Sequence, residues 1–459
     1  MNLNPAPQRR TALRGDLLDF SATPAWGALD TPALRWRPDH WLLIDEQGRV
    51  AGALPGDQPP GDDWLKLEDH RGQLLMPGFV DTHVHCPQLD VIASYGANLL
   101  DWLDTYTFPA ERRFADPAVA QAGAALFLDA LLAHGTTTAV VFPTVHAASV
   151  DALFEAASAR GMRVVAGKVL MDRHAPDGLR DDVAGAEADC ERLIARWHGQ
   201  GRNSYAVTVR FAVTSTPEQL AMAGNLLQRH AGLYMQTHVA ENTDEVRWVG
   251  ELFPEARSYL DVYHRAGLLN ERAVLAHGIW LDAHDRQLLA DTGAQIAFCP
   301  SSNLFLGSGL FNWQAAHDVG HRVTLASDVG GGTSLSMPRT LAEGYKVQML
   351  RGTKLSAWTA LHAATRGAAE SLGLGHELGS FDEGTLADVV AWRWAQGAVG
   401  EHRDAVARGA VPGLADHGLH ARVFAWLTLA DERHVAATYT AGRRVFSATE
   451  VATAGARPC

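Results

Sequence analysis

The sequence predicts an α/β protein, a (β/α)8 barrel of the TIM type with a small β-sandwich formed by both termini. Three features lead to this prediction: eight runs rich in β-branched or aromatic residues, longer amphipathic stretches between these runs, and β-rich segments at both ends. Strand-like runs that alternate with helical stretches are typical of parallel sheets with crossover helices. Eight such units close a barrel.

The eight predicted strands follow one another along the chain. Helix start signals stand between them, because Asp116 precedes Pro117 and Thr216 precedes Pro217, which places an N-cap residue before a proline in the first turn. The predicted strands are residues 79–85, 136–143, 162–170, 205–213, 233–241, 272–280, 294–300 and 322–328.

Both ends of the chain are strand-like. Residues 40–55 resemble two strands joined by a turn at Gly48, and residues 385–394 and 434–447 are also β-rich. We expect a composite β-sandwich domain of residues 1–74 and 385–459, beside a barrel of residues 75–384. Two unrelated β-extensions are the alternative.

Composition indicates a folded globular protein, since 47% of the 459 residues are hydrophobic and 20% are charged. The net charge of −13 argues against binding to nucleic acid or to an anionic membrane surface, and favours a small neutral ligand.

We predict no signal peptide and no membrane span, because the N-terminal basic residues precede no apolar run. The four scattered cysteines form no CxxC pair, which predicts no disulfide scaffold and a cytoplasmic location.

Histidines and acids stand at the C-terminal ends of the predicted strands, where the active site of a barrel lies. The first strand closes with His83 and His85, and alternation along the strand places Phe79 and Asp81 on the same face. The other residues of this kind are His238 and Glu241 at the fifth strand, His277 at the sixth and Asp328 at the eighth.

Each of these residues has a structural alternative. His277 could be a hydrogen-bonded core residue, Asp328 could cap the next turn, and Glu241 could be a first-turn helix acid. Together, however, three imidazoles and a carboxylate suit zinc or iron(II). Such a metal lowers the pKa of water toward about 7. Asp328 could then take the proton of water, and Glu241 could serve as the second acid/base group.

The fourth predicted strand ends with Arg210 and not with a lysine that could bridge two metals, so we expect one metal per subunit. Lys168, in the third strand, is expected to form a salt bridge among the strands. Cys86 follows His85 and should point to the other face, as a buried thiol that does not bind the metal.

The stretches PGFVDTHVH, THVAEN, LAHG and LASDVGGG resemble the amidohydrolase superfamily, in which a metal site lies on a distorted (β/α)8 barrel beside a β-sandwich made from both termini. Residues 83–111, GKVLMD, TVRFAVTST, THVAENTDEV and residues 299–311 are similar, more narrowly, to the guanine deaminases of that superfamily. The resemblance covers nearly the whole chain. It implies a homodimeric hydrolase of purine catabolism that converts guanine and water to xanthine and ammonia.

The resemblance also implies roles for single residues. It makes Asp328 an activator of water, His277 a ligand or a hydrogen-bond partner of that water, and Glu241 a proton shuttle. The implied zinc ligands are His83, His85, His238 and Asp328, with iron(II) as the alternative metal.

Four further residues match those that surround the purine. The resemblance implies that Gln88 and Arg210 hold guanine and that Phe211 and Trp102 line its pocket; Asp101 and Asn303 stand in matching stretches and receive no role. The planar guanidinium of arginine can donate hydrogen bonds to the acceptors O6 and N7 of guanine. The side-chain amide of glutamine can both donate and accept, which suits the edge of guanine that carries donors and acceptors. Two alternatives stay open: a related amidohydrolase acting on another purine, a pyrimidine or a triazine, and a catalytically inactive scaffold.

Overall fold

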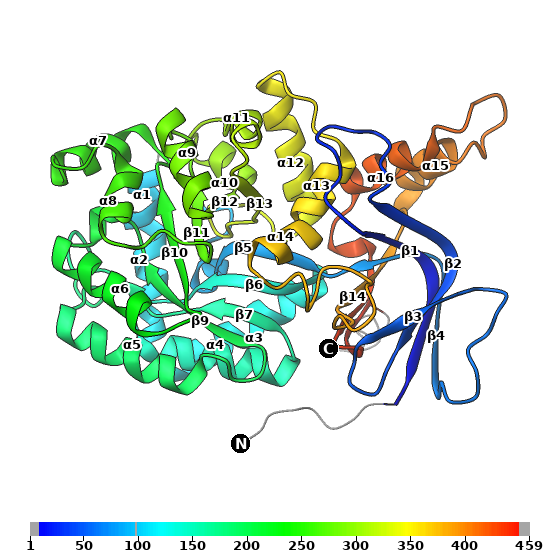
Figure 1. Cartoon of the computed structure of the whole chain (residues 1–459), viewed down its shortest axis with the longest axis horizontal. Helices are drawn as coiled ribbons and strands as arrows, with labels where there is room; N and C mark the ends of the chain where they lie inside the picture. The colour runs from blue at the N-terminus through cyan, green and yellow to red at the C-terminus, as the bar shows by residue number, and fades with distance from the viewer. Residues whose placement is uncertain (1–8, 97–98, 449–459) are drawn as a thin grey trace, which may run out of the picture.

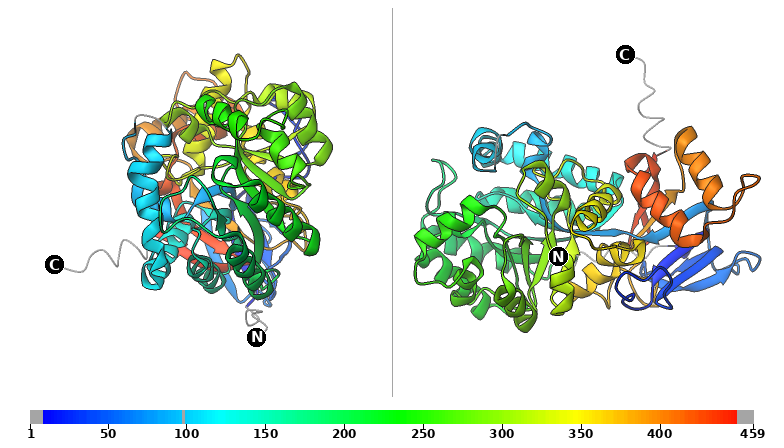
Figure 2. Two further views of the ribbon diagram at one scale, coloured as in Figure 1. Left: turned by 90° about the vertical axis from the view of Figure 1, so that its left-hand side faces the viewer. Right: turned by 90° about the horizontal axis from the view of Figure 1, so that it is seen from above.

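A computed structural model describes residues 9–96 and 99–448. Figure 1 shows two parts side by side: a barrel of strands surrounded by helices, and a sheet built from both ends of the chain. The second view in Figure 2 shows the same division from above. The barrel and the composite terminal sheet are therefore present as predicted, whereas the domain boundaries remain a prediction.

Parallel strands form the barrel in the order β13-β12-β11-β10-β9-β7-β6-β5, with β8 paired to β9. The ring closes between β5 and the segment after β13, where Asp328 N donates to His83 O over 3.0 Å and His85 N donates to Val329 O over 2.9 Å. The strands are β5 Phe79–His85, β6 Thr136–Phe142, β7 Arg163–Ala166, β8 Val169–Leu170, β9 Asn203–Val209, β10 Tyr234–Val239, β11 Ala273–His277, β12 Gln295–Phe298 and β13 Arg322–Leu325.

All eight predicted strands are present, although several are shorter than predicted. The third is divided into β7 and β8, and the eighth ends at Leu325, so that Asp328 lies in the segment after the strand. The predicted helix starts are also confirmed, because Asp116 accepts a hydrogen bond from Ala118 N and Thr216 accepts one from Gln219 N.

The prediction that Phe79 shares a face with His83 was wrong. Phe79 packs against Trp392 of the terminal sheet at a ring distance of 5.6 Å, while the next residue, Val80, belongs to the buried cluster inside the barrel. The pairing of β5 with β6 shifts register between Asp81 and Val84. Such a bulge reverses the alternation of side chains, and strict period-two reasoning cannot anticipate it.

The terminal sheet has seven strands in the order β16-β15-β14-β4-β1-β2-β3. One buried cluster combines side chains from both chain ends, among them Leu13, Leu42, Val389 and Tyr439. Strands β1 and β4 were not predicted from the sequence. The strands are β1 Thr11–Phe20, β2 Leu34–Ile44, β3 Val50–Pro55, β4 Lys66–Pro77, β14 Val389–Arg393, β15 Val435–Thr440 and β16 Arg443–Ser447.

Helices occupy most of the remaining connections, and α15 and α16 lie between the two C-terminal runs that were predicted as strands. The helices are α1 Leu99–Trp102, α2 Phe108–Arg112, α3 Pro117–Ala133, α4 Ala147–Arg160, α5 Val183–Trp197, α6 Pro217–Arg229, α7 Thr243–Leu252, α8 Tyr259–Arg265, α9 Ala283–Thr292, α10 Pro300–Phe305, α11 Trp313–Asp318, α12 Met337–Leu350, α13 Ala357–Ala363, α14 Arg366–Ser371, α15 Gly397–Ala407 and α16 Gly418–Leu429.

Among the described residues, no single helix combines the length and the apolar character needed to cross a membrane. One pair of helical segments, Leu99–Ala115 and Pro117–Ala133, passes that test together, but the two segments are bent by 116° relative to each other.

Candidate active site

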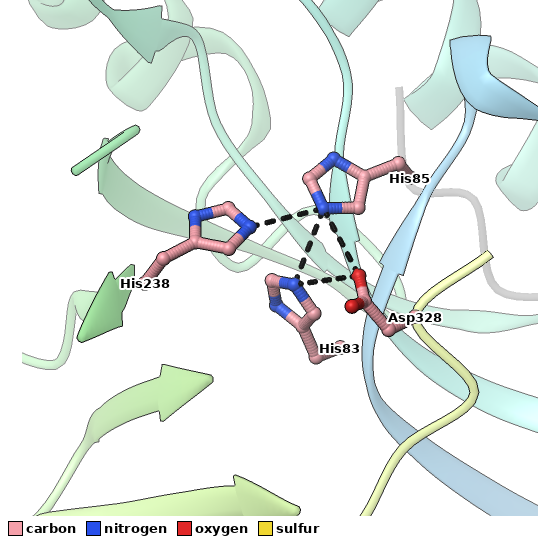
Figure 3. Close-up of side chains that lie close together, drawn as sticks. All are labelled: His83, His85, His238 and Asp328. Carbon is pink, nitrogen blue, oxygen red and sulfur yellow. Dashed lines mark hydrogen bonds and ion pairs between the residues drawn. The ribbon is translucent and has the colours of Figure 1, made fainter. Parts of the chain in front are cut away.

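Three histidines and one aspartate converge at the C-terminal ends of the strands (Figure 3). His85 Nε2 lies 3.2 Å from both His83 Nε2 and His238 Nε2, and Asp328 Oδ1 lies 3.2 Å from His83 Nε2 and 3.3 Å from His85 Nε2. The predicted metal ligands are therefore neighbours in space, although they come from β5, β10 and the segment after β13.

These distances fit a metal ion. Zinc binds imidazole nitrogen at about 2.0–2.1 Å, so two corners of a zinc tetrahedron lie roughly 3.3 Å apart. His238 Nδ1 lies 2.6 Å from Arg210 O, and because a carbonyl only accepts, Nδ1 must carry the proton. The lone pair of Nε2 then faces the shared centre, as a metal ligand requires.

The surroundings keep these groups in the protonation states that bind metal. Burial lowers the pKa of His85 to about 3. Burial and the neighbouring imidazoles also hold the pKa of His238 well below its usual value. Burial alone would raise the pKa of Asp328, but the facing histidines hold it well below its ordinary range. Neutral imidazoles and an ionised carboxylate are the ligand forms that a divalent cation binds.

Three residues at the same place have a strained backbone. Ala240, His277 and Asp328 adopt φ angles of 47°, 72° and 50°, a left-handed region that residues other than glycine seldom occupy. Such strain persists where the surrounding structure enforces it, and it is common at functional sites. Asp328 does not cap the next turn with its side chain, since Gly332 N donates to its backbone oxygen.

Glu241 lies beside the histidine group and is almost completely buried. It precedes Asn242, the N-cap of α7, so it is not one of the acids of the first helical turn. Ser308 Oγ donates to its Oε1 over 3.0 Å, and its Oε2 lies 3.4 Å from His277 Nε2. Burial, and then the negative charge of Asp328, raise the pKa of Glu241 to about 8. The side chain is therefore a proton donor at neutral pH.

His277 is oriented by an amide. Its Nδ1 lies 2.8 Å from Asn303 Oδ1, so Nδ1 donates and Nε2 presents a lone pair toward Glu241 and toward Asp328 Oδ2, 3.7 Å away. His277 is thus not a member of the four-residue group but stands next to it.

A cavity opens beside this group. Every predicted catalytic and substrate-binding residue lines it, whereas His83 is not among the lining residues. The lining residues are His85, Gln88, Leu99, Trp102, Leu103, Arg210, Phe211, His238, Glu241, Glu245, His277, Ser302, Leu306, Asp328 and Gly331.

Gln88 and Arg210 are joined within the protein. Glu111 accepts a hydrogen bond of 3.3 Å from Gln88 Nε2 and one of 2.6 Å from Arg210 Nη1. The Arg210 guanidinium also lies over the ring of Phe108, 5.1 Å from its centroid. Gln88 Oε1 accepts a hydrogen bond from Gly330 N over 3.1 Å. Gln88 and Arg210, which Glu111 of α2 holds together, form what we call the polar end of the cavity.

A sequence profile described as the amidohydrolase family matches residues 74–445, which is more than half of the chain. The chain belongs to the amidohydrolase family. It is 44% identical to the guanine deaminase of Escherichia coli K12 over 95% of this chain and 97% of that protein.

Solved structures agree with this assignment. The structure of E. coli guanine deaminase superposes with a TM-score of 0.89 at 42% identity, over 95% of this chain and 99% of that one. A guanine deaminase from C. acetobutylicum with guanine bound in its active site has a TM-score of 0.83 at 25% identity, over 95% of this chain and all of that one.

Several residues of this amidohydrolase site were not assigned a role from the sequence. Glu111 and Asn303 lie within stretches that already indicated the family, but their partners are distant in the chain. Glu245 accepts hydrogen bonds from Glu241 N and Tyr259 Oη, and burial together with Glu241 raises its pKa to about 7. Lys168 forms an ion pair with Asp181 at 2.5 Å, but Asp181 lies in the segment between β8 and α5 and not on a barrel strand as predicted.

Two cysteines lie near this amidohydrolase site. Cys299 Sγ lies within 4.8 Å of ligand atoms of His277 and Asp328, but burial raises the pKa of its thiol well above the usual value. Cys86 is buried, as predicted, and lies outside the His/Asp group.

We expect Cys86→Ala to keep its full metal content, because burial also raises the pKa of the Cys86 thiol and disfavours the thiolate that binds metal. Elemental analysis of the purified variant against the wild type measures this directly. Loss of metal in a variant that folds normally would contradict the placement of Cys86 outside the site.

Proposed function

We propose that this chain deaminates guanine hydrolytically to xanthine and ammonia, as a step of purine catabolism. One observation carries the proposal: the Gln88 and Arg210 pair shares a single cavity with the His/Asp group and with Glu241. The guanidinium of Arg210 and the amide of Gln88 can form hydrogen bonds with the edge of a planar neutral purine. The buried proton donor Glu241 can protonate an amine that must leave as ammonia. The guanine deaminases similar to this chain support the same substrate.

We propose zinc as the metal, one per subunit, held by His83, His85, His238 and Asp328, with iron(II) as the alternative that this donor set also accepts. When bound, the metal supplies Lewis acidity, which makes water a nucleophile at neutral pH.

The polar end of the cavity holds the substrate. Arg210 offers the N–H groups that Glu111 does not occupy to O6 and N7 of guanine, and Gln88 offers one donor and one acceptor. Phe211 and Trp102 supply apolar surface for the ring faces. This arrangement directs C2 and its amino group toward Glu241 and Asp328.

Proton transfers follow from the protonation states. Asp328 is ionised and accepts a proton from the attacking water, and the lone pair on His277 Nε2 orients that water. Glu241 is protonated and delivers its proton to the ring nitrogen next to C2. A C–O bond forms at C2. The ionised Glu241 then takes the proton of the new C2 hydroxyl and gives it to the amino nitrogen, so that the C2–N bond breaks, the C2=O bond forms, and ammonia and xanthine result. The proton that Asp328 took from water returns to Glu241 and restores both side chains.

We also propose a homodimer in the cytoplasm. The family resemblance supports the dimer, and the three cysteines that the structure describes, Cys86, Cys190 and Cys299, are unpaired and buried, as suits a reducing compartment. Light scattering coupled to size-exclusion chromatography, repeated at several protein concentrations, measures the oligomeric state. A constant monomer mass would contradict the dimer.

The function is tested with purified full-length protein and guanine. We expect xanthine, followed by ultraviolet absorbance, and ammonia, measured separately, to appear in equal amounts. Both should disappear after chelation and return when zinc is added. If metal is bound but guanine is not converted, the assignment of the polar end fails, and other amino-heterocycles become the substrates to test.

A further inference from the structure

Glu111 connects the two side chains that the proposed function assigns to guanine. It comes from α2, whereas Gln88 follows β5 and Arg210 follows β9. The exposed fraction is 0% for Glu111 and 3% for both Gln88 and Arg210. Glu111 itself does not line the cavity, so it lies behind the two residues that do.

Glu111 sets the charge of the polar end. Among the described residues that line the cavity, Arg210 is the only arginine or lysine. Its ion pair with Glu111, 2.6 Å long, neutralises that charge inside the protein. A buried arginine without a partner would instead attract an anion, because Coulomb interactions are strong where water is excluded. The paired arginine keeps its N–H donors but adds no net charge to the cavity.

Glu111 also fixes the orientation of the Gln88 amide. An ionised carboxylate accepts hydrogen bonds only, so it must face Nε2 of Gln88, while Gly330 N must face Oε1. One N–H and one lone pair then remain for a ligand. Glu111 thus holds the Nε2 end of the amide, and Gly330 N holds the Oε1 end.

We propose that Glu111 is a positioning residue that makes the cavity select a neutral purine, by neutralising Arg210 and by fixing the amide of Gln88. This inference rests on the proposed function. It predicts that a chain without the Glu111 charge binds guanine more weakly, and that it favours anionic purines relative to guanine.

The test uses metal-loaded full-length protein and compares wild type with Glu111→Gln. We expect the KM for guanine to rise about tenfold or more, because the Arg210 charge loses its buried partner. We also expect the ratio of the inhibition constant of xanthine to the KM of guanine to fall. That fall should occur at alkaline pH, where xanthine loses a proton, and not in mildly acidic buffer, where xanthine is neutral. A purely structural role would not produce this dependence on pH.

Glu111→Asp is the conservative variant. It keeps the charge but shortens the side chain, so we expect the KM for guanine to rise. The ratio of the inhibition constant of xanthine to the KM of guanine should stay at its wild-type value. An unchanged KM in Glu111→Asp would overturn the positioning role even if Glu111→Gln did not accumulate as folded protein.

Asp388→Asn is the matched control, because Asp388 is 4% exposed and its carboxylate pairs with Arg202 at 2.5 Å, away from the cavity. Asp388→Asn should lower the melting temperature without changing the KM of guanine or the ratio of the inhibition constant of xanthine to that KM.

The two proposals fail in different ways. If the wild type converts guanine but Glu111→Gln keeps its KM and its ratio, only the inference about Glu111 is overturned. If the wild type neither converts nor binds guanine, the proposed function fails and the inference falls with it.

Discussion

We expect replacement of Glu241 with glutamine to lower kcat for guanine by about 10²- to 10⁴-fold, the usual contribution of a positioned general acid/base. Glutamine preserves the size of the side chain and its contact with Ser308, so we expect the KM to stay close to that of the wild type. It carries no transferable proton, however, and cannot protonate the ring or the leaving nitrogen. Steady-state kinetics under metal saturation separate the two parameters.

Two controls make this result specific to Glu241. Glu251→Gln changes an exposed glutamate near the end of α7, the helix that follows Glu241, and should leave kcat unchanged. The metal content of Glu241→Gln should equal that of the wild type, because Glu241 is not part of the His/Asp group. A wild-type kcat in Glu241→Gln would show that another residue shuttles the proton.

The same carboxyl should limit activity at high pH. Its pKa is raised to about 8, so Glu241 holds its proton below that pH and loses it above. The acid form is the donor, and therefore kcat/KM should fall as the pH rises through this value. A bound cation favours the ionised form and moves the fall to lower pH. A pH profile of kcat/KM that stays flat to well above pH 8 would contradict the proton-donor role.

The elements that the sequence predicted are those with local signals. The eight strand runs, the two Asp/Thr-Pro helix starts and the histidine pair on β5 are all recognisable within a few residues. β1 and β4 were missed because their evidence is not local. β4 begins with the polar, largely exposed run KLEDHRGQ, and β1 contains Gly15, near which its register with both neighbouring strands shifts. Only pairing between distant segments makes strands of them.

The residues of the site also divide into those that a local sequence signal indicates and those that only the folded chain brings together. The four residues of the His/Asp group could be predicted as neighbours because the barrel fold brings strand ends together at a known place, so each strand contributes a position that can be recognised separately. Glu111 could not be predicted as a residue of the site, because a glutamate in a helical stretch is usually exposed. Its partners Gln88 and Arg210 contact it only in the folded chain. The orientation of His277 by Asn303 likewise depends on a contact between β11 and α10.

Removal of the metal should abolish activity and lower stability. Three imidazole Nε2 atoms and a carboxylate oxygen meet within 4.8 Å of one another, and in the absence of a cation the lone pairs of these atoms repel one another. A metal that binds only the folded chain stabilises it by mass action, by about 2.7 kcal/mol at a hundredfold excess over its Kd. We therefore expect chelation to reduce turnover to background and to lower the melting temperature, with zinc restoring both.

His238→Ala should reproduce the chelated state permanently. Because His238 contributes one of the three Nε2 atoms, the variant should bind little metal, show no turnover of guanine, and have a melting temperature that does not respond to zinc. His376→Ala, which removes a histidine whose side chain is 75% exposed, is the matched control and should respond to zinc as the wild type does. Activity that survives in a metal-free His238→Ala variant would exclude metal-assisted attack of water. Retention of one tightly bound zinc would instead mean that His83, His85 and Asp328 suffice to hold the metal.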